Sequence, residues 1–336
     1  MKKIDAAGGF LTPGLLDLHV HGGAGKDFFA LDRRDLLRIL RFHYRRGTTS
    51  LLPTFSAALV GEIAAATEFI KKASSEPPGS STIVGINSEG PFLNPARAGA
   101  QKIERILPPD PKLLKKIISA AGGRLKLMTL APEVEGAPAL IPLLKDAGVI
   151  PAIGHTLADY RTARRAILAG IAYATHIFNA YPPFHHREPG ALGAIFDSPE
   201  VYTEVIADGI HVSPPVLRFL FRLRPLERII LVSDCVASET GAGQRKRRLP
   251  AARLPDGTLA GGRQGLGEAV WNLVRWVGLP LERALIPATL NPARVLNLEK
   301  KKGDLDSGMD ADLVIWSAGG QALRTVVGGE TVYQKR

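Results

Sequence analysis

Residues 15–21 read Leu15-Leu16-Asp17-Leu18-His19-Val20-His21, and Gly22 and Gly23 follow directly. This run is apolar until it meets the Gly-Gly pair, so we expect a buried strand over residues 15–21. Side chains two apart on a strand point to the same face, so Asp17, His19 and His21 share one face. Two imidazoles in that arrangement can bind one cation, although for an isolated His-x-His a satisfied, buried pair is the commoner interpretation. Because this pair ends the strand and Gly22 and Gly23 follow it, we favour the ligand interpretation here.

Short apolar runs of the same kind recur along the chain, and the stretches between them are long enough for one helix each. Further strands are expected over residues 48–55, 83–88, 124–130, 150–154, 171–176, 201–207 and 229–232. Amphipathic patterns predict helices over residues 35–46, 111–121, 158–169 and 214–223. Eight strand–helix units in about 250 residues are the size of a (β/α)8 barrel, so we expect an α/β fold built on a TIM-like barrel.

The pattern changes after the last expected strand. Residues 267–278 and 280–288 look helical, whereas residues 302–316 and 325–333 read as short strands joined by Gly-rich turns. We therefore divide the chain into a barrel over residues 13–299 and a small β appendage formed by residues 1–12 and 300–336. The appendage is too short to close a core of its own.

The composition excludes several classes of protein. Hydrophobic residues make up 45% and charged residues 22% of the 336 residues, as in a globular protein and unlike a disordered one. Because no apolar run is long enough to span a bilayer and no export signal opens the sequence, we expect a cytoplasmic protein without a membrane partner. The single cysteine, Cys235, excludes an internal disulfide and a cysteine-built zinc site.

The net charge of +11 favours anionic partners, such as nucleic acid or phosphorylated small molecules. The densest basic run, residues 245–248, lies in a Gly-rich stretch without interleaved aromatic residues. That composition favours a solvated loop over a nucleic-acid surface, so we expect no nucleic-acid partner.

Residues that suit catalysis fall at the expected strand ends, which is the face of a barrel where active sites form. Glu89 follows the third expected strand, and His155 and His176 lie at the ends of the fifth and sixth. Two histidines and a glutamate form a zinc-like set that leaves a position open for water. Asp234 follows the last strand, where it could move a proton between water and a leaving group or cap a helix. His43, His185 and His186 are interpreted as packed or solvated histidines.

Taken in order, these segments resemble the N-acetylglucosamine-6-phosphate deacetylase family of the metal-dependent amidohydrolase superfamily, from about residue 5 to the end of the chain. The first motif, Pro13 to Gly22, is shared across the superfamily. The combination specific to this family is Glu89-Gly90-Pro91-Phe92-Leu93-Asn94, Phe178-Asn179-Ala180 and Asp208-Gly209-Ile210-His211. Further matches are Gly154-His155-Thr156, Thr175-His176-Ile177, Arg187-Glu188-Pro189-Gly190, Leu231-Val232-Ser233-Asp234, Leu259-Ala260-Gly261-Gly262 and Asn291-Pro292-Ala293-Arg294.

The resemblance implies hydrolysis of the acetamide of N-acetylglucosamine 6-phosphate to glucosamine 6-phosphate and acetate, a step of amino-sugar catabolism. It implies that Glu89, His155 and His176 hold a divalent metal ion, with zinc expected first and iron, manganese or cobalt as alternatives. One or two ions per subunit are expected, because His19 and His21 would hold a second one. Asp234 would act as general base and then as general acid.

The resemblance also implies which residues contact the substrate and that the protein is a homodimer. Arg187 and His211 would reach the phosphate in the site of the neighbouring subunit. The implied substrate contacts are Gln101, Asn179, Ala180, Arg187, His211, Ala260, Gly261 and Gly262.

Two features depart from the family pattern. The family has a histidine where this chain has Gln101, and glutamine can donate a hydrogen bond but cannot carry charge. In addition, the segment before the first barrel strand is shorter than in the family, where it forms half of a β-sandwich. Either the true start of the protein lies upstream, or this is a shortened form. In a shortened form we expect an incomplete β-sandwich in which strands such as residues 313–316 lack their usual partners, with reduced stability or an unusual oligomer as the consequence.

Three alternatives stay open at this point. A deacetylase of another N-acetyl-hexosamine phosphate, such as N-acetylgalactosamine 6-phosphate, would use the same residues. A cyclic-amide hydrolase of the dihydroorotase type would need a lysine at the end of the fourth strand, and residues 127–133 contain none. A non-catalytic binding protein on the same scaffold is disfavoured by the intact set of Glu89, His155, His176 and Asp234.

Overall fold

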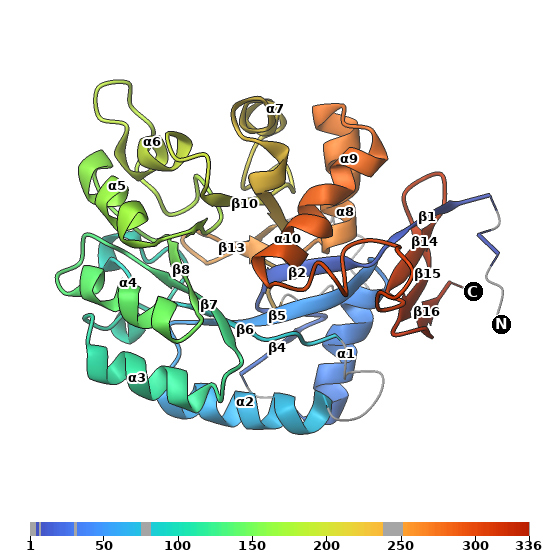
Figure 1. Ribbon diagram of the computed structural model, residues 1–336, viewed down its shortest axis with the longest axis horizontal. Helices are drawn as coiled ribbons and strands as arrows, with labels where there is room; N and C mark the ends of the chain where they lie inside the picture. Colours follow the sequence, from blue (N-terminus) through green and yellow to red (C-terminus); the bar gives the residue numbers. More distant parts are fainter. Residues whose placement is uncertain (1–4, 7, 30–31, 75–81, 238–250, 336) are drawn as a thin grey trace.

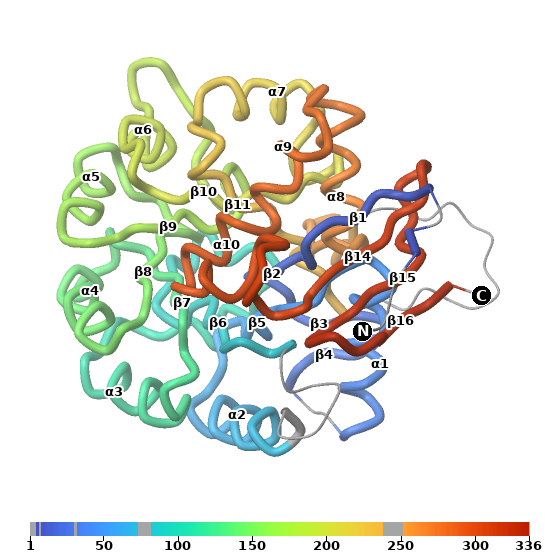
Figure 2. The backbone as a smooth tube through the Cα atoms, turned by 45° about the vertical axis from the view of Figure 1, so that its right-hand side comes forward, coloured from blue at the N-terminus to red at the C-terminus, as the bar shows by residue number. Residues whose placement is uncertain are grey.

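The centre of the protein is a barrel of eight parallel strands surrounded by helices (Figures 1 and 2). The structure, a computed structural model, describes residues 5–6, 8–29, 32–74, 82–237 and 251–335. The strands lie side by side in the order of the chain: β2 (Leu15–Val20), β5 (Thr48–Ser56), β6 (Ile86–Glu89), β7 (Leu125–Leu130), β8 (Ile150–Ile153), β9 (Tyr173–Ala174), β10 (Tyr202–Ile206) and β11 (Ile229–Val232). The barrel closes between β11 and β2, because the Asp234 N–H donates to the His19 carbonyl at 3.0 Å and the His21 N–H donates to the Cys235 carbonyl at 2.8 Å.

The strands are buried on both faces, as expected of parallel strands covered by helices. Inside the barrel, inward-facing side chains from seven strands pack together: Leu18, Leu52, Leu127, Ala152, Tyr173, Ile206, Ile230 and Val232. A larger apolar cluster lies between the strands and the helices. The predicted barrel is confirmed, and every predicted barrel strand lies within three residues of an observed one at each end.

The helices on the outside of the barrel are α1 (Arg33–Tyr44), α2 (Val60–Ser74), α3 (Pro111–Ala120), α4 (Ala137–Asp146), α5 (Tyr160–Ala169), α6 (Gly190–Phe196) and α7 (Pro214–Leu223). Three of them begin after an aspartate whose carboxylate accepts a hydrogen bond from the first turn, namely Asp32, Asp110 and Asp159. The sequence predicted α1, α3, α5 and α7. It did not predict α2, α4 and α6, of which α4 contains a proline and α6 has only seven residues.

Two small hairpins lie at the carboxyl ends of the first and last barrel strands. The first pairs β3 (Gly22–Gly23) with β4 (Lys26–Asp27), and the second pairs β12 (Ala251–Arg253) with β13 (Leu259–Gly262). The chain then forms α8 (Leu266–Asn272), a π-helical turn over Leu273–Val277, α9 (Leu281–Leu285) and α10 (Leu290–Val295), where two helices had been predicted. None of the helices in the described ranges is long and apolar enough to cross a membrane, and the cytoplasmic location stays a prediction. The basic run 245–248 lies outside the described residues.

The two ends of the chain form one antiparallel sheet beside α1, in the order β1 (Phe10–Pro13), β14 (Leu313–Trp316), β15 (Ala322–Val327) and β16 (Glu330–Gln334) (Figure 2). The prediction that residues 313–316 lack a partner is wrong, because β14 pairs with β1 on one edge and with β15 on the other. Within the described residues the appendage is this single sheet, as expected of an incomplete sandwich. The division of the chain at residues 12/13 and 299/300 stays a prediction.

Trp316 fixes this sheet to the barrel. Its side chain is buried, and its indole N–H donates to the Thr12 hydroxyl at 2.8 Å. Gly47 and Gly267 leave room for the indole, since a Cβ at either position would lie within 2.8 Å of the ring. Residues 302–305, predicted as strand, instead bend at residues 302–304, where the buried Lys302 ammonium binds the carboxylate of Asp312 at 2.6 Å.

Candidate metal centre and active site

Six histidine and carboxylate side chains converge at the carboxyl ends of the barrel strands. Glu89 is the last residue of β6, and His19 and His21 lie at the end of β2. His155, His176 and Asp234 each lie two residues beyond a strand, after β8, β9 and β11. Because the strands are parallel, residues far apart in the sequence meet at one rim.

One group consists of Glu89, His155 and His176. The Glu89 Oε1 atom lies 2.8 Å from the Nε2 atom of each histidine, and the two Nε2 atoms lie 3.2 Å apart. All three side chains are at least 94% buried. The ligand atoms all lie within 4.8 Å of one another, so one ion could contact all three.

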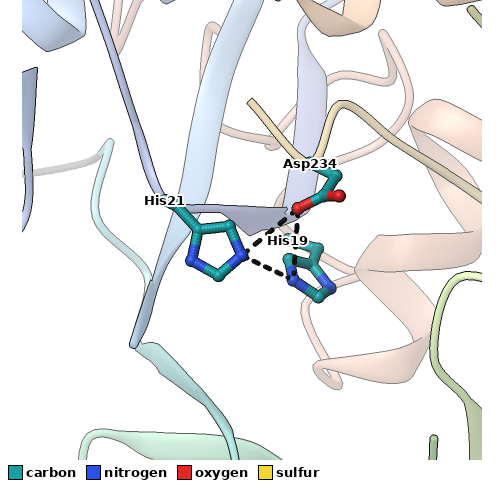
Figure 3. A group of neighbouring side chains, drawn as sticks. All are labelled: His19, His21 and Asp234. Atoms are coloured by element: carbon teal, nitrogen blue, oxygen red, sulfur yellow. Dashed lines mark hydrogen bonds and ion pairs between the residues drawn. The ribbon is translucent and has the colours of Figure 1, made fainter. Parts of the chain in front are cut away.

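The second group consists of His19, His21 and Asp234 (Figure 3). The Asp234 Oδ1 atom lies 3.2 Å from His21 Nε2 and 3.6 Å from His19 Nε2, and the two Nε2 atoms lie 3.1 Å apart. The two groups are adjacent, because Glu89 Oε2 lies 3.5 Å from His21 Nε2.

All four histidines turn Nε2 toward the centre, and three of them have Nδ1 bound on the other side. His21 Nδ1 faces the Thr54 carbonyl at 3.1 Å, and His155 Nδ1 faces the Arg97 carbonyl at 2.7 Å. His19 Nδ1 faces the Glu204 carboxylate at 2.8 Å. A carbonyl or carboxylate partner requires Nδ1 to carry the proton, which leaves Nε2 able to act as a ligand.

The backbone is strained where these side chains are presented. Of the eight non-glycine residues with positive φ among those described, five lie at this rim: His155, His176, Phe178, Ala180 and Asp234. A left-handed conformation of this kind costs about 1 kcal/mol or more per residue and persists only where surrounding contacts hold it. Clustering of such residues is typical of a functional site.

The charges in the two groups stabilise one another. Burial would raise the pKa of Glu89, but His155, His176 and His19 hold it well below its usual range. Burial likewise opposes the ionised form of Asp234, but contacts with His21 and His19 lower its pKa. Burial would lower the pKa of His19, whereas Glu204, Glu89 and Asp234 raise it to about 10.

This donor set fits a divalent cation. With Nδ1 protonated, His155 would direct a lone pair at Glu89 Oε1, so a positive charge must lie between two acceptors only 2.8 Å apart. A proton or a metal ion can supply that charge, and four imidazoles with two carboxylates suit a transition-metal ion. By contrast, Cys235 is buried and burial raises the pKa of its thiol, so it is no nucleophile.

A cavity of about 880 Å³ opens above the two groups and is large enough for a small-molecule substrate. Six of the predicted substrate residues line it together with every member of the two groups except His19: Gln101, Asn179, Ala180, His211, Ala260 and Gly261. Both side-chain polar atoms of Gln101 are buried and have no partner within the described residues. Gly262 lies just outside the lining, with its N–H donating to the Asp234 carbonyl at 2.7 Å.

Two of the predicted substrate residues, His211 and Arg187, lie in different surroundings. His211 lines the cavity of its own chain, and its side chain is 2% exposed because Asp208 holds Nδ1 at 2.7 Å. The contact of His211 with the site of a neighbouring subunit stays a prediction. Arg187 is exposed, does not line the cavity, and contacts His186 Nε2 at 2.9 Å.

Sequence reasoning missed several residues that support or line the site. Glu204 stands inside a predicted strand, and a charged residue there was a usable signal. Glu133 follows β7 and accepts hydrogen bonds from Thr156 and Asn94, which links two of the motifs. Arg253 and Arg263 line the cavity from the second hairpin and the residue after it.

A parallel barrel that gathers histidines and carboxylates at one rim, beside a cavity, defines the class of metal-dependent hydrolases. The sequence model of the amidohydrolase family matches residues 10–332. The chain belongs to the amidohydrolase family and, within it, to the N-acetylglucosamine-6-phosphate deacetylases, as the motifs predicted. Family membership and the two donor groups together support a divalent metal cofactor.

The relatives are similar over almost the whole chain. The chain is 35% identical to N-acetylglucosamine-6-phosphate deacetylase of Bacillus subtilis, over 99% of this chain and 87% of the relative. The human enzyme of that name is 31% identical over 99% and 86% of the two chains. The crystal structure of N-acetylglucosamine-6-phosphate deacetylase from Pasteurella multocida superimposes with a TM-score of 0.90 at 28% identity, covering 98% and 88%. A mutant of the Mycobacterium smegmatis enzyme in complex with N-acetyl-D-glucosamine-6-phosphate gives 0.89 at 31% identity, covering 96% and 87%.

Proposed function

We propose that the protein hydrolyses N-acetylglucosamine 6-phosphate to glucosamine 6-phosphate and acetate. The relatives carry the name of that activity, and the Mycobacterium smegmatis mutant holds the substrate. The observation that carries the proposal is the position of Asp234, which lines the cavity and whose carboxylate contacts His21 and His19 at the ligand groups. N-acetylgalactosamine 6-phosphate differs only in the configuration of one hydroxyl and is the alternative substrate.

The protein's own residues supply the proton transfers. Asp234 is ionised in the structure because its pKa is lowered, so its carboxylate can accept a proton from the attacking water. The same oxygen then donates the proton to the nitrogen of the leaving amine. A divalent cation, when bound, supplies Lewis-acid polarisation of the amide carbonyl and lowers the pKa of water.

Glu89, His155 and His176 would hold the first ion, and His19 and His21 with Asp234 would hold a second. We propose zinc, because imidazole and carboxylate ligands in compact groups suit it, with iron, manganese and cobalt as alternatives. One ion is expected to bind firmly, since the first group has the shorter contacts between its ligands.

We assign the substrate contacts according to their place in the cavity. The free amide of Gln101 can donate to the acetamide or a sugar hydroxyl, and Asn179, Ala180, Ala260 and Gly261 line the remaining wall. His211 would contact the substrate phosphate within its own chain. Gly262 supports Asp234 from outside the lining.

We propose a homodimer in which Arg187 reaches the phosphate in the partner's site. Arg187 is exposed and lies outside its own cavity, so it is available to a second copy. Val216, Phe219 and Leu223 form an exposed apolar stripe on α7, with exposed fractions of 36%, 54% and 50%. Such a stripe suits burial in an interface between subunits.

The first test measures acetate release from both sugar phosphates by the zinc-loaded protein. Asp234→Asn should lower turnover at least about 100-fold while the first ion is retained. The same change at Asp256, an exposed aspartate in the β12–β13 turn, is the matched control and should leave turnover unchanged. Normal turnover by Asp234→Asn would contradict the proton-transfer role, and no acetate from either substrate would contradict the function.

The second test mixes two inactive proteins. If Arg187 acts in the partner's site, Arg187→Ala subunits supply an intact Asp234 and receive Arg187 from Asp234→Asn subunits, so refolded mixtures regain activity. Recovery of about a quarter of the wild-type rate is expected from random pairing. Mixtures no more active than the separate variants would show that Arg187 does not act across an interface.

A further inference from the structure

We propose that Glu204 is a positioning residue that ties the two metal groups together and fixes His19 as a ligand of the second ion. Glu204 lies inside β10, between the strands that lead to His176 and Asp234, and its side chain is fully buried. Glu204 does not line the cavity, and its carboxylate contacts none of the ligand atoms of the first group. It acts on the site through two residues, one in each group.

The first contact orients an imidazole. The Glu204 Oε1 atom lies 2.8 Å from His19 Nδ1, and both side chains are 0% exposed. A carboxylate at Nδ1 places the proton there and directs the Nε2 lone pair at His21 and Asp234. The Nδ1 atoms of His21 and His155 face backbone carbonyls instead. His19 is therefore the one of these three histidines whose Nδ1 has a charged partner, and a charged acceptor forms the stronger hydrogen bond.

The second contact holds the backbone of the other group. The same Oε1 atom accepts a hydrogen bond from the His176 N–H at 3.0 Å, and the Glu204 carbonyl accepts one from the Ile177 N–H at 2.8 Å. Glu204 therefore binds the N–H groups on both sides of the His176 Cα atom. The φ angle of His176 is +23°. Such a conformation persists only where contacts fix it, and Glu204 supplies two of them.

Burial makes these contacts costly to lose. The other carboxylate oxygen of Glu204 has no hydrogen-bond partner within the described residues. A buried carboxylate needs partners that offset its lost hydration, and the His19 imidazole, whose Nδ1 lies 2.8 Å away, is one of them. Glu204 thus depends on His19 as His19 depends on Glu204, and loading of the second group with a cation should strengthen both.

The test measures ion binding by the full-length protein rather than its activity. Wild type, Glu204→Gln and Glu204→Asp are stripped with a chelator and titrated with Zn²⁺ in competition with a chromophoric chelator, and bound zinc is counted by elemental analysis. We expect two ions in the wild type and about 10- to 100-fold weaker binding of the second ion in Glu204→Gln. Glu204→Asp keeps the charge but withdraws the carboxylate by one methylene, so it should also weaken the second ion.

Two controls make the outcome specific. Thr203→Val changes the neighbouring buried residue of β10, whose side chain points to the other face of the strand, and should leave both affinities within two-fold of wild type. In a His19→Asn background, Glu204→Gln should cause no further loss at the second group, because the ligand it orients is gone. Circular dichroism shows whether each variant is folded. If Glu204→Gln does not fold, the zinc titration of Glu204→Asp is used in its place.

Wild-type affinity for both ions in folded Glu204→Gln or Glu204→Asp would overturn the proposal. A wild type that binds one ion only would overturn it as well, since His19 would then hold no metal. Failure of acetate release, with ion binding as expected, would contradict the proposed function and leave this inference standing.

Discussion

His43 offers a test of how burial controls protonation in this protein. It lies in α1, is fully buried, and its Nε2–H donates to the Gly22 carbonyl at 3.0 Å, directly after the His21 ligand. Its Nδ1 atom is buried and has no partner within the described residues. Burial lowers the pKa of His43 from 6.5 to about 4, because the hydrogen bond to Gly22 only partly offsets the lost hydration of the cation.

The sign and size of the effect follow from this pKa. Between pH 6.5 and pH 4 the unfolded chain binds a proton at His43 and the folded protein does not, so the free energy of unfolding falls as the pH falls. The contribution is complete above pH 6.5. Since each pH unit between the two values changes the free energy by at most about 1.4 kcal/mol, the loss at pH 4 amounts to about 3 kcal/mol.

His43→Gln removes the titration and keeps a donor for the Gly22 carbonyl, because the glutamine amide reaches about as far as imidazole Nε2. Urea unfolding of both proteins is measured from pH 7 to pH 4 in excess chelator, so that metal binding does not contribute. Wild type should lose about 3 kcal/mol more than His43→Gln over this range. Parallel stability curves for the two proteins would refute the burial argument, whatever their offset at pH 7.

Three further outcomes are expected. Removal of metal by a chelator should abolish acetate release and leave the circular dichroism unchanged, and added Zn²⁺ should restore the rate; activity that survives complete removal would contradict a metal-dependent reaction. Trp316→Ala should lower the free energy of unfolding by about 3–5 kcal/mol in urea titrations, because it empties a buried site and removes the hydrogen bond that the indole donates to the Thr12 hydroxyl. Gln101→His should change kcat/KM for the sugar phosphate with zinc content unaltered; an unchanged value would show that Gln101 does not contact the substrate.

The barrel could be predicted from the sequence because each strand is a short, fully buried apolar run. Runs such as residues 48–55 and 229–232 carry that signal without help from distant contacts. The helices were less predictable. Residues 137–146 contain two prolines, Pro138 and Pro142, in their first two turns, and their helix is stabilised by packing of the buried Leu140 and Leu144 rather than by local preference.

The edge strand β1 shows what local patterns could not predict. Phe10–Pro13 ends in a proline and has two exposed residues, which is a weak strand signal. It forms because β14 offers an unpaired edge at that place, a contact across some three hundred residues of chain. The expectation of an unpartnered β14 failed for the same reason, since pairing partners distant in the sequence leave no local trace.

The residues of the candidate site also fall into a set that local patterns predict and a set that they do not. The six convergent side chains were predictable, because a parallel barrel brings every strand end to one rim and the histidines and carboxylates stand at those ends. The residues that orient them were not, since Glu204 and Glu133 act through contacts that depend on side-chain direction and on the path of neighbouring loops. His211 illustrates the limit: its motif was identified, but the hydrogen bonds that its ring and its N–H donate to Asp208 place the ring in the cavity of its own chain.

The strained residues explain why the site needs this supporting layer. His155, His176 and Asp234 all lie two residues past a strand in left-handed conformation, so the regular ladder cannot hold them. Each is held instead by a specific contact: the Arg97 carbonyl for His155, Glu204 for His176, and the His19 carbonyl for the Asp234 N–H. Because strand geometry places these residues at the rim and separate contacts set their orientation, a substitution in the supporting layer should alter ion affinity before it alters the fold.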